Sequence, residues 1–354
     1  MRLLILNPGS TSTKIAVYEG DREIFSENIA HSAEQVGRYK RMVDQKDFRK
    51  EIILKTLAGR GIDPKSFAAV IGRGGLLKPI PSGTYEVNAR LIEDLAAGVQ
   101  GEHASNLGGL LADEIARPLG LPAYIVDPVV VDELADWARL TGFAEIKRRS
   151  IFHALNHKYS ARLAAEALGR PYEDLNLIVG HLGGGISIGV HDHGRVIDVN
   201  NALNGEGPIA PERAGTMPAA DLAALCFSGR FTLDEIKKKI AGKGGMVAHL
   251  GTNDLRAVEK RIEEGDASAA LVFEAMANTT AKQIGGAAAV LKGKVDGIVL
   301  TGGLMHSAKL VELIQSHISF LGPVFIYPGE NEMAALASAG GRILRGEEPA
   351  KTYN

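Results

Sequence analysis

A strand, a glycine-rich turn and a second strand occur twice in this chain, once in each half, and this repeat constrains the fold more than any other feature. The first copy is LLILNPGSTSTKIAVYEGDREI, residues 3–24, and the second is LIVGHLGGGISIGVHDHGRVIDV, residues 177–199. Asn7 in the first copy corresponds to His181 in the second. Each copy predicts a β-hairpin whose turn exposes backbone N–H groups, and such turns form concave anion sites. Two of them can bind one polyphosphate from both sides.

Composition limits the possible classes of protein. The chain has 354 residues, which is longer than one hydrophobic core usually supports, so two domains are expected. Apolar residues make up 45% and charged residues 23% of the chain, an ordinary globular balance. A net charge of −2 argues against nonspecific binding to nucleic acid or to anionic membranes. No stretch is long enough to span a bilayer.

The chain contains a single cysteine, Cys226. This excludes an intramolecular disulfide and suits a reducing compartment, so a cytoplasmic protein is expected. Cys226 lies in the apolar sequence LAALCF, which predicts a small buried side chain and not a nucleophile.

The first half predicts a sheet with flanking helices. AAVIGRGG, residues 68–75, is an apolar strand that ends in a glycine turn carrying Arg73. LPAYIVDP is a strand that ends at Asp127, because the following proline has no N–H group for pairing. The spacing of apolar residues predicts helices over residues 34–60, 88–97 and 105–116.

The second half also alternates helices and strands. Residues 151–169 predict a helix with Gly169 at its C-terminal cap, and residues 267–291 predict a long alanine-rich helix. Residues 295–304 predict a strand, a glycine turn and the start of a helix, which presents N–H groups to a phosphate or nucleotide. The alternation indicates an α/β protein. We expect one domain over residues 1–150, joined by a C-terminal helix over 332–354, and a second domain over 151–331.

A series of motifs, in this order across nearly the whole chain, resembles the acetate and butyrate kinase family: NPGSTSTK, GRGG, IVDP, FH, GHLGGG, PERAG, DLR, LTGG and NE. The GRGG form, the chain length and the GHLGGGIS turn are most similar to the butyrate kinase branch. The resemblance implies the duplicated fold of actin, sugar kinases and the 70-kDa heat-shock ATPases, with nucleotide in a cleft between the domains. It also implies a homodimer.

The resemblance further implies a site for ATP or ADP. The three glycines of the second turn permit close backbone approach to phosphate, and the motif is not a Walker A loop because no Gly-Lys-Ser or Gly-Lys-Thr ends it. A flexible surface turn is the alternative, but it does not explain the apolar strands on either side. The residues expected to bind nucleotide are Asn7, Ser10, Ser12, Lys14, His181, Gly183, Gly184, Gly185, Asp254, Leu255, Arg256, Thr301, Gly302 and Gly303.

Phosphoryl transfer depends on positioning and charge neutralisation. Arginine suits both purposes because its planar fork donates two parallel hydrogen bonds and keeps its charge. Spacing alone favours surface positions for Arg73 and Arg213 and a structural role for His153. Asp127 ends a strand, where α/β sheets place active residues, and its alternative is a turn-forming role. The resemblance instead implies that these four residues are catalytic, with Arg73 holding the acid while Arg213 and His153 neutralise the moving phosphoryl group.

The resemblance also implies a Mg²⁺ site at Asn7 and Glu332, with Glu330 as the alternative to Glu332. Mg²⁺ keeps most of its waters, which suits so few carboxylates. A fatty-acid carboxyl has a pKa of about 4.3 and is ionised at neutral pH, so Asp127 has no proton to remove. We therefore expect Asp127 to organise metal-bound water or the arginine pair.

The expected activity is reversible, direct in-line phosphoryl transfer from ATP to a short-chain acid such as butyrate or a branched analogue. Acetate and propionate kinases are close alternatives, because one methylene changes discrimination by only about 1 to 3 kcal/mol. A sugar kinase of the same fold would need a general base, for which Asp127 is the candidate. An ATP-switched scaffold is the non-enzymatic alternative. Leu76, Leu77 and Phe152 in the acceptor segments favour an apolar acid over a sugar.

Overall fold

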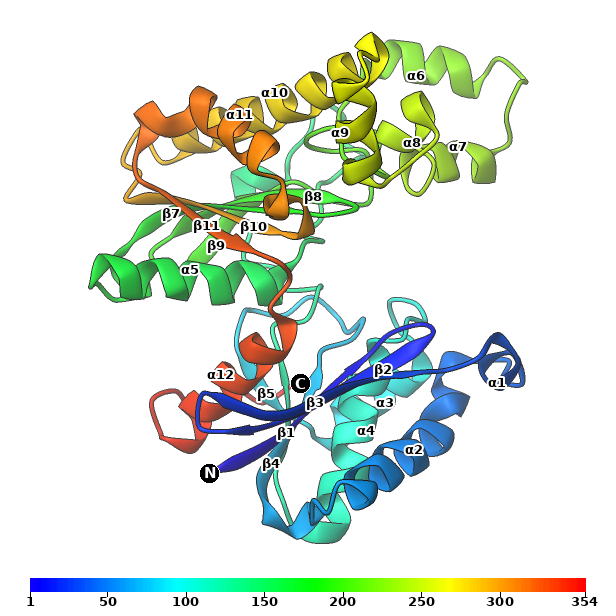
Figure 1. The fold of residues 1–354 in the computed structure, drawn as a ribbon, viewed down its shortest axis with the longest axis vertical. Coiled ribbons are helices and arrows are strands. Elements are labelled where there is room, and N and C mark those ends of the chain that lie inside the picture. The colour runs from blue at the N-terminus through cyan, green and yellow to red at the C-terminus, as the bar shows by residue number, and fades with distance from the viewer. The chain divides into compact units, whose positions relative to one another are not determined.

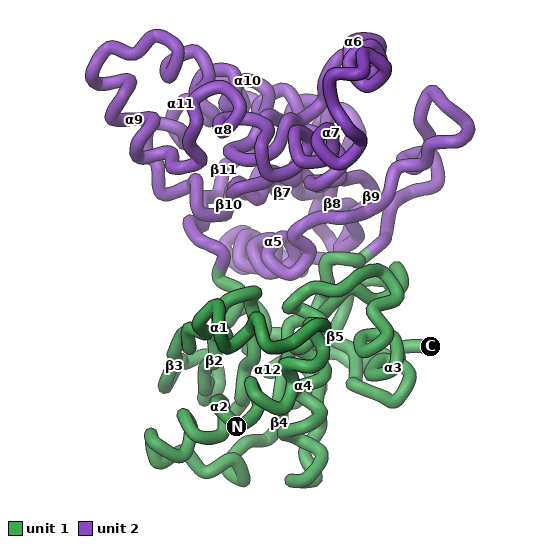
Figure 2. The backbone as a smooth tube through the Cα atoms, turned by 90° about the vertical axis from the view of Figure 1, so that its right-hand side faces the viewer, with its two compact units in different colours: residues 1–131, 331–354 green, residues 132–330 purple.

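The computed structural model describes residues 1–354 and divides into two compact units (Figure 2). Unit 1 comprises Met1–Val131 together with Asn331–Asn354, and unit 2 comprises Asp132–Glu330. The sequence predicts residues 132–150 in the N-terminal domain, whereas in the structure they belong to unit 2. Their charged sequence gave no signal for the boundary, which has no low-complexity linker. No helix combines the length and the apolar character needed to cross a membrane.

Unit 1 is built on a six-stranded sheet with the order β3-β2-β1-β4-β6-β5. The strands β1, β4 and β6 are parallel to one another, whereas β2, β3 and β5 pair antiparallel. The parallel strands are rich in buried β-branched and aliphatic residues, as expected for strands covered on both faces. Their bounds are β1 Arg2–Pro8, β2 Ser12–Glu19, β3 Arg22–Ala30, β4 Phe67–Arg73, β5 Thr84–Glu86 and β6 Ala123–Val126.

Helices cover both faces of this sheet (Figure 1). The C-terminal helix α12 packs on β1 and β4 across one face, and α4 packs on β4 and β6 across the other. The C-terminal segment therefore completes the fold of the N-terminal unit. The helices are α1 Ala33–Gly37, α2 Lys46–Gly59, α3 Ala89–Ala97, α4 Asn106–Ala116 and α12 Glu332–Leu344.

Unit 2 contains a five-stranded sheet with the order β11-β10-β7-β8-β9. The strands β7, β10 and β11 are parallel, and β8 and β9 continue antiparallel from β7. Read from β9, the order therefore repeats the β3-β2-β1-β4-β6 arrangement of unit 1, and only β5 has no counterpart in unit 2. The bounds are β7 Asn176–Leu182, β8 Ile186–Asp192, β9 Arg195–Val199, β10 Gly297–Gly302 and β11 Val324–Pro328.

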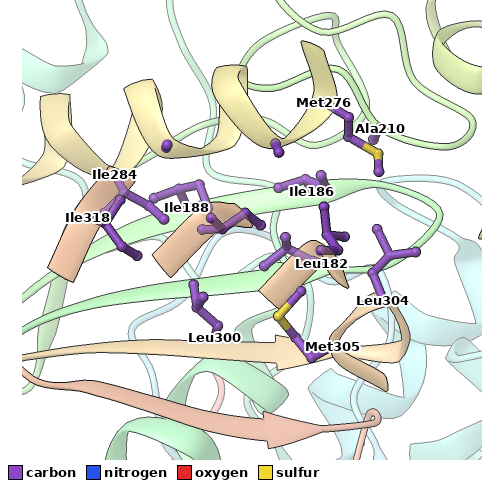
Figure 3. Close-up of a cluster of buried hydrophobic side chains, with 14 of the residues drawn as sticks. Leu182, Ile186, Ile188, Ala210, Met276, Ile284, Leu300, Leu304, Met305 and Ile318 are labelled. Carbon is purple, nitrogen blue, oxygen red and sulfur yellow. The ribbon is translucent and has the colours of Figure 1, made fainter. Parts of the chain in front are cut away.

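The helices of unit 2 lie on both sides of its sheet, with α10 and α11 on one face and α5 on the other (Figure 1). Figure 3 shows the larger core, in which Leu182, Ile188 and Leu300 of the sheet meet Met276 and Ile284 of α10. The helices are α5 Ala154–Leu168, α6 Ala219–Cys226, α7 Leu233–Ile240, α8 Gly245–Leu250, α9 Leu255–Glu263, α10 Ala267–Val290 and α11 Ala308–Ile318.

Both predicted hairpins are present. In the first, Asn7 on β1 faces Lys14 on β2, and residues 9–11 form what we call the first turn. In the second, Leu182 on β7 faces Ile186 on β8, and residues 183–185 form the second turn. The two turns occupy equivalent places in their respective sheets.

Two local predictions are wrong. The segment predicted as one helix over residues 34–60 is interrupted, because α1 ends at Gly37 and α2 begins at Lys46. Cys226 is exposed, because α6 has no buried residue and the adjacent Phe227 is 92% exposed. The apolar run LAALCF therefore belongs to an exposed helix and not to the core.

Candidate active-site residues and family

The candidate residues of unit 1 gather where three parallel strands end. Asn7 is the penultimate residue of β1, Arg73 is the last residue of β4, and Asp127 follows β6 directly. These strands are adjacent and parallel, so their carboxyl ends share one edge of the sheet, where α/β proteins place ligands. Glu332 reaches the same edge from the first turn of α12.

Asn7, Arg73 and Glu332 form one polar cluster. The amide of Asn7 donates to Glu332 Oε2 at 2.5 Å, and Arg73 Nη2 lies 2.9 Å from Glu332 Oε1. Arg73 Nη1 donates to Asn7 Oδ1 at 3.3 Å. The Arg73 side chain is 35% exposed, so this cation remains accessible to an anionic ligand.

Asp127 occupies a constrained position. Its φ angle is 34°, in the left-handed region that few non-glycine residues adopt. Its Oδ1 accepts hydrogen bonds from Ser82 Oγ and from the N–H of Gly83, both at 2.7 Å. The carboxylate is thus fixed as a hydrogen-bond acceptor, which agrees with an organising role better than with that of a base.

The second turn is partly exposed, since Gly184 is exposed, Gly183 is half-buried and Gly185 is buried. A Cβ atom on Gly183, Gly184 or Gly185 would come no closer than 3.3 Å to the rest of the protein. None of these three glycines has a positive φ angle, and only a Cβ atom on Gly183 would meet a tight contact, with His181 Nε2. Three consecutive glycines permit close approach of a ligand to the backbone.

Arg213 lies beside this turn. Its Nε is 3.7 Å from the position of a Cβ atom on Gly185, and its Nη1 donates to the carbonyl and the carboxylate of Glu212. The Nε–H group is buried and has no hydrogen-bond partner. A buried donor without a partner costs about 1–3 kcal/mol, and an anion at the turn would remove this cost. Glu212 also accepts from Asn253 Nδ2 at 2.5 Å.

His153 and His181 lie together in unit 2. Their rings are stacked with centroids 3.8 Å apart, and His153 is the N-cap residue of α5. His181 is buried and its Nδ1 lies 2.9 Å from Asn156 Oδ1. Since Asn156 also donates through Nδ2 to the carbonyl of Glu330, its Oδ1 accepts, and His181 carries a proton on Nδ1.

A series of buried polar groups extends from His153, and we call it the histidine network. His153 Nδ1 is 2.9 Å from Ser187 Oγ, which is 2.8 Å from His157 Nε2. His157 Nδ1 is 3.4 Å from His191 Nε2, and His191 Nδ1 is 2.7 Å from the hydroxyl of Tyr172. Burial lowers the pKa of both His157 and His191 well below the usual value of 6.5. Both rings are therefore neutral at physiological pH.

The LTGG segment has one buried and one open part. Thr301 is fully buried, and its hydroxyl donates to the carbonyl of Gly329 at 3.2 Å. A Cβ atom on Gly302 would lie 2.3 Å from the carbonyl oxygen of Leu182, and its φ angle is 97°, so only glycine fits. Gly303 faces open space. A nucleotide at this segment would therefore meet the backbone near Gly303, and not the Thr301 side chain.

The DLR segment forms the start of α9. Asp254 caps the helix by accepting from the N–H of Arg256 at 3.0 Å, and it also pairs with the Arg256 side chain. The Arg256 side chain is 89% exposed, whereas Leu255 packs into the core of unit 2. Of these three residues, Arg256 has the side chain most available to a ligand.

Other candidates lie on the first hairpin. Ser10 and Lys14 are exposed and Ser12 is half-buried. No group of three or more His, Cys, Asp or Glu side chains lies close enough to hold a metal ion. The fit to Mg²⁺ therefore depends on the Asn7–Glu332 pair, whose hard oxygen atoms and single carboxylate suit an ion that keeps most of its waters.

Comparison with known proteins assigns the family. A model of the acetokinase family matches residues 141–347. Butyrate kinase 1 of Clostridium acetobutylicum is 55% identical over 352 residues, which cover 99% of this chain and 99% of that protein. The chain belongs to the acetokinase family. This confirms the family that the sequence motifs predicted.

Solved structures confirm the fold of this acetokinase family member. An acetate kinase from Porphyromonas gingivalis matches with a TM-score of 0.80 at 20% identity, covering 97% of this chain and 99% of that chain. A propionate kinase from Francisella tularensis matches with a TM-score of 0.75 at 20% identity, covering 96% and 98%. A ROK family protein from Streptococcus pneumoniae matches at 0.53 and 11% identity, covering 98% and 100%. The predicted α/β class, with the sheet of one half repeated in the other, is therefore correct.

Sequence reasoning did not single out several residues that contact the candidates. Ser187 lies within the motif GHLGGGIS and Glu212 within PERAG. Their places in these motifs are the sequence feature that could have identified them. Burial, together with the nearby charge of Arg73, lowers the pKa of His103. Arg49 contacts the first turn from a distant helix, and nothing in its local sequence, KDFRKEI, distinguishes it from a surface arginine.

Proposed function

We propose that this protein is an ATP-dependent butyrate kinase, which reversibly transfers the γ-phosphoryl group of ATP to a short-chain carboxylic acid. Membership of the acetokinase family and 55% identity to a butyrate kinase over the full length support the activity. The structural observation that carries the proposal is the buried Nε–H of Arg213, which lacks a hydrogen-bond partner and lies beside Gly185 of the second turn. A phosphate oxygen would accept a charge-assisted hydrogen bond from this donor.

The proposed chemistry needs no base. A carboxylate oxygen of the acid attacks the γ-phosphorus, and the bond from that phosphorus to the β-phosphate oxygen breaks. The electron pair stays on ADP, and the product is an acyl phosphate. Because the acid is already ionised at neutral pH, no proton must move, and Asp127 can keep both of its hydrogen bonds from Ser82 and Gly83.

In this proposal unit 2 binds the nucleotide. The backbone of Gly183–Gly185 receives the β- and γ-phosphates, and Arg213 and His153 neutralise the charge that develops on the phosphoryl group. The backbone at Gly303 and the side chain of Arg256 lie at the remaining nucleotide contacts. Such preorganised donors usually supply the largest part of the rate enhancement in phosphoryl transfer.

Unit 1 in turn binds the acid and the metal. Arg73 pairs with the carboxylate of the acid, while Asn7 and Glu332 hold Mg²⁺ through their side-chain oxygens. When bound, Mg²⁺ would neutralise charge on the nucleotide phosphates. The contact between Glu332 and Asn7 favours Glu332 over Glu330 as the acidic ligand, because Glu330 is exposed and belongs to unit 2.

A hydroxamate assay tests the function. The purified protein is incubated with ATP, Mg²⁺, hydroxylamine and one acid of a series from acetate to valerate, including isobutyrate, and the trapped acyl phosphate is measured as its coloured iron complex. We expect the highest kcat/KM with a four-carbon acid. A preference for acetate would instead assign the protein to acetate kinases, and ADP formation with glucose but with no acid would assign it to sugar kinases.

A homodimer and a cytoplasmic location remain predictions. Light scattering would test the first, since a dimer has twice the 37.6 kDa mass of one chain. A monomeric mass at micromolar protein would contradict it.

A further inference from the structure

Arg49 on α2 is a charged residue that is completely buried, with an exposed fraction of 0%. Fully buried arginines are rare unless a carboxylate or another anion accompanies them. Arg49 therefore needs an explanation that its local sequence does not give.

The guanidinium of Arg49 holds the first turn from its inner side. Three backbone carbonyls, one hydroxyl and one side-chain amide accept all its hydrogen bonds, at distances from 2.8 to 3.1 Å. The acceptors are Gly9 O, Ser10 O, Ser12 O, Thr13 Oγ1 and Gln45 Oε1.

No carboxylate neutralises this cation. All five of its acceptors are uncharged, and Arg49 forms no ion pair. His31 is a titratable neighbour, and its Nε2 lies 2.8 Å from Thr13 Oγ1. Burial, together with the Arg49 charge, lowers the pKa of His31 to about 4, so His31 is neutral at physiological pH. A full positive charge is thus buried beneath the first turn without a counter-charge.

The carbonyls bound by Arg49 fix the direction of the turn's amides. In a trans peptide the carbonyl oxygen and the following N–H point in opposite directions. Because the oxygens of Gly9 and Ser10 point toward Arg49, the N–H groups of Ser10 and Thr11 point away from it. Both residues are exposed, and neither N–H donates to another group of the protein.

We propose that Arg49 is a positioning residue that turns the Ser10 and Thr11 amides outward, and that a phosphate-type anion at the first turn supplies the missing counter-charge. Arg49 does not touch this anion, since it is fully buried, but its charge attracts the anion through the peptides that it orients. This inference deepens the proposed function and rests on it, because the anion in turnover would be the phosphoryl group in transfer.

The test compares three full-length variants with the wild type. Arg49→Met removes both the positive charge and the guanidinium donors. Arg49→Lys keeps the positive charge but lacks the planar guanidinium group. Lys50→Met is the matched control, since it removes a cation from the next position of α2 whose partner is Glu114 and not the turn. Inorganic phosphate is the probe, titrated at constant ionic strength. Thermal unfolding and hydrogen exchange of residues 9–13 are followed.

In the wild type and in Lys50→Met we expect phosphate to raise the unfolding temperature and to slow amide exchange at Ser10 and Thr11. In Arg49→Met the apparent Kd for phosphate should rise at least about tenfold, because a buried charge interacts strongly with a nearby anion. Arg49→Lys should recover part of this loss. The KM for acyl phosphate should rise in parallel, while the Kd for ADP should stay within about twofold.

A merely structural role predicts a different pattern. The variants would then unfold at lower temperature, but phosphate would stabilise them as much as it stabilises the wild type, and that result would overturn the inference. If Arg49→Met does not fold, Arg49→Lys tests the proposal. Unchanged phosphate affinity and unchanged amide hydrogen exchange at the first turn in that variant would contradict it. If phosphate slows amide exchange at Ser10 and Thr11 but the protein phosphorylates no acid, the result would support the inference and refute only the proposed function.

Discussion

The imidazole rings of His153 and His181 are stacked at a centroid separation of 3.8 Å, with their planes inclined by only 14°. Two protonated rings at this distance would repel each other. His181 is fixed by Asn156 and His153 by Ser187. The geometry of both rings is thus set before any ligand binds, which is the preorganisation that phosphoryl transfer requires.

Removing the hydroxyl of Ser187 should therefore release His153. In Ser187→Ala we expect kcat to fall about tenfold or more, with little change in the KM for ATP, because positioning a catalytic group affects the transition state more than substrate binding. The ¹⁵N chemical shifts of the His153 ring should move toward those of a mixed tautomer. Ser160→Ala is the matched control, since Ser160 is also a fully buried serine of unit 2 and lies outside the histidine network. Equal effects of the two variants would exclude a specific role for Ser187.

Arg213 provides a second prediction. Arg213→Ala should lower kcat by about a thousandfold, since arginines that stabilise the phosphoryl group contribute about 10³ to 10⁵ to the rate. The Kd for ADP, measured by calorimetry, should change much less. Arg230→Ala, which alters an exposed arginine of the same unit, should retain full activity. If Arg213→Ala turns over at the wild-type rate, Arg213 is not catalytic.

The two glutamates near the start of α12 allow a matched test of the metal site. Glu332→Gln should raise the Mg²⁺ concentration needed for half-maximal activity at least about tenfold, because it removes the carboxylate that contacts Asn7. Glu330→Gln should leave it unchanged. A chelator should abolish turnover in every variant. A larger effect of Glu330→Gln than of Glu332→Gln would assign the metal to the other glutamate.

His31 makes the stability of unit 1 depend on pH. Its pKa is about 4 in the folded protein and about 6.5 when unfolded. The stabilisation that neutral His31 provides is therefore complete above pH 6.5 and is lost as the pH falls from 6.5 toward 4. Between pH 7.5 and pH 5 we expect a loss of about 1 to 2 kcal/mol in unfolding free energy that His31→Gln does not show. Urea unfolding at both pH values measures this difference. If the unfolding free energies of the wild type and of His31→Gln change equally between the two pH values, the assignment of this loss to His31 is wrong.

The sequence predicted the parts of this protein that local patterns specify. Both hairpins, the strand before Asp127 and the helix over residues 267–290 follow from alternation, helical spacing and glycine or proline signals. Cys226 shows the limit of such patterns, because an apolar run predicts burial only when another element covers it. The contacts of Arg49 and Ser187 depend on tertiary neighbours 30 or more residues away in sequence. Single-sequence reasoning has no access to such contacts.

The return of the C-terminus to the N-terminal unit was predicted, whereas the boundary at Val131 was not. The α12 segment carries an apolar stripe and a motif of the family, so its partner could be inferred by resemblance. Residues 132–150 carry mixed charges without periodicity. Their membership of unit 2 depends on contacts such as Arg148 with Asp198 and Glu206, which only the folded chain reveals.

Nucleotide binding at the second turn is tested most directly by a crystal structure of the protein with ADP and Mg²⁺. We predict that the diphosphate contacts the backbone N–H groups of residues 183–185 and that an oxygen accepts from Arg213 Nε. Nucleotide bound elsewhere, with the Arg213 Nε–H still lacking a partner, would contradict the proposed active site.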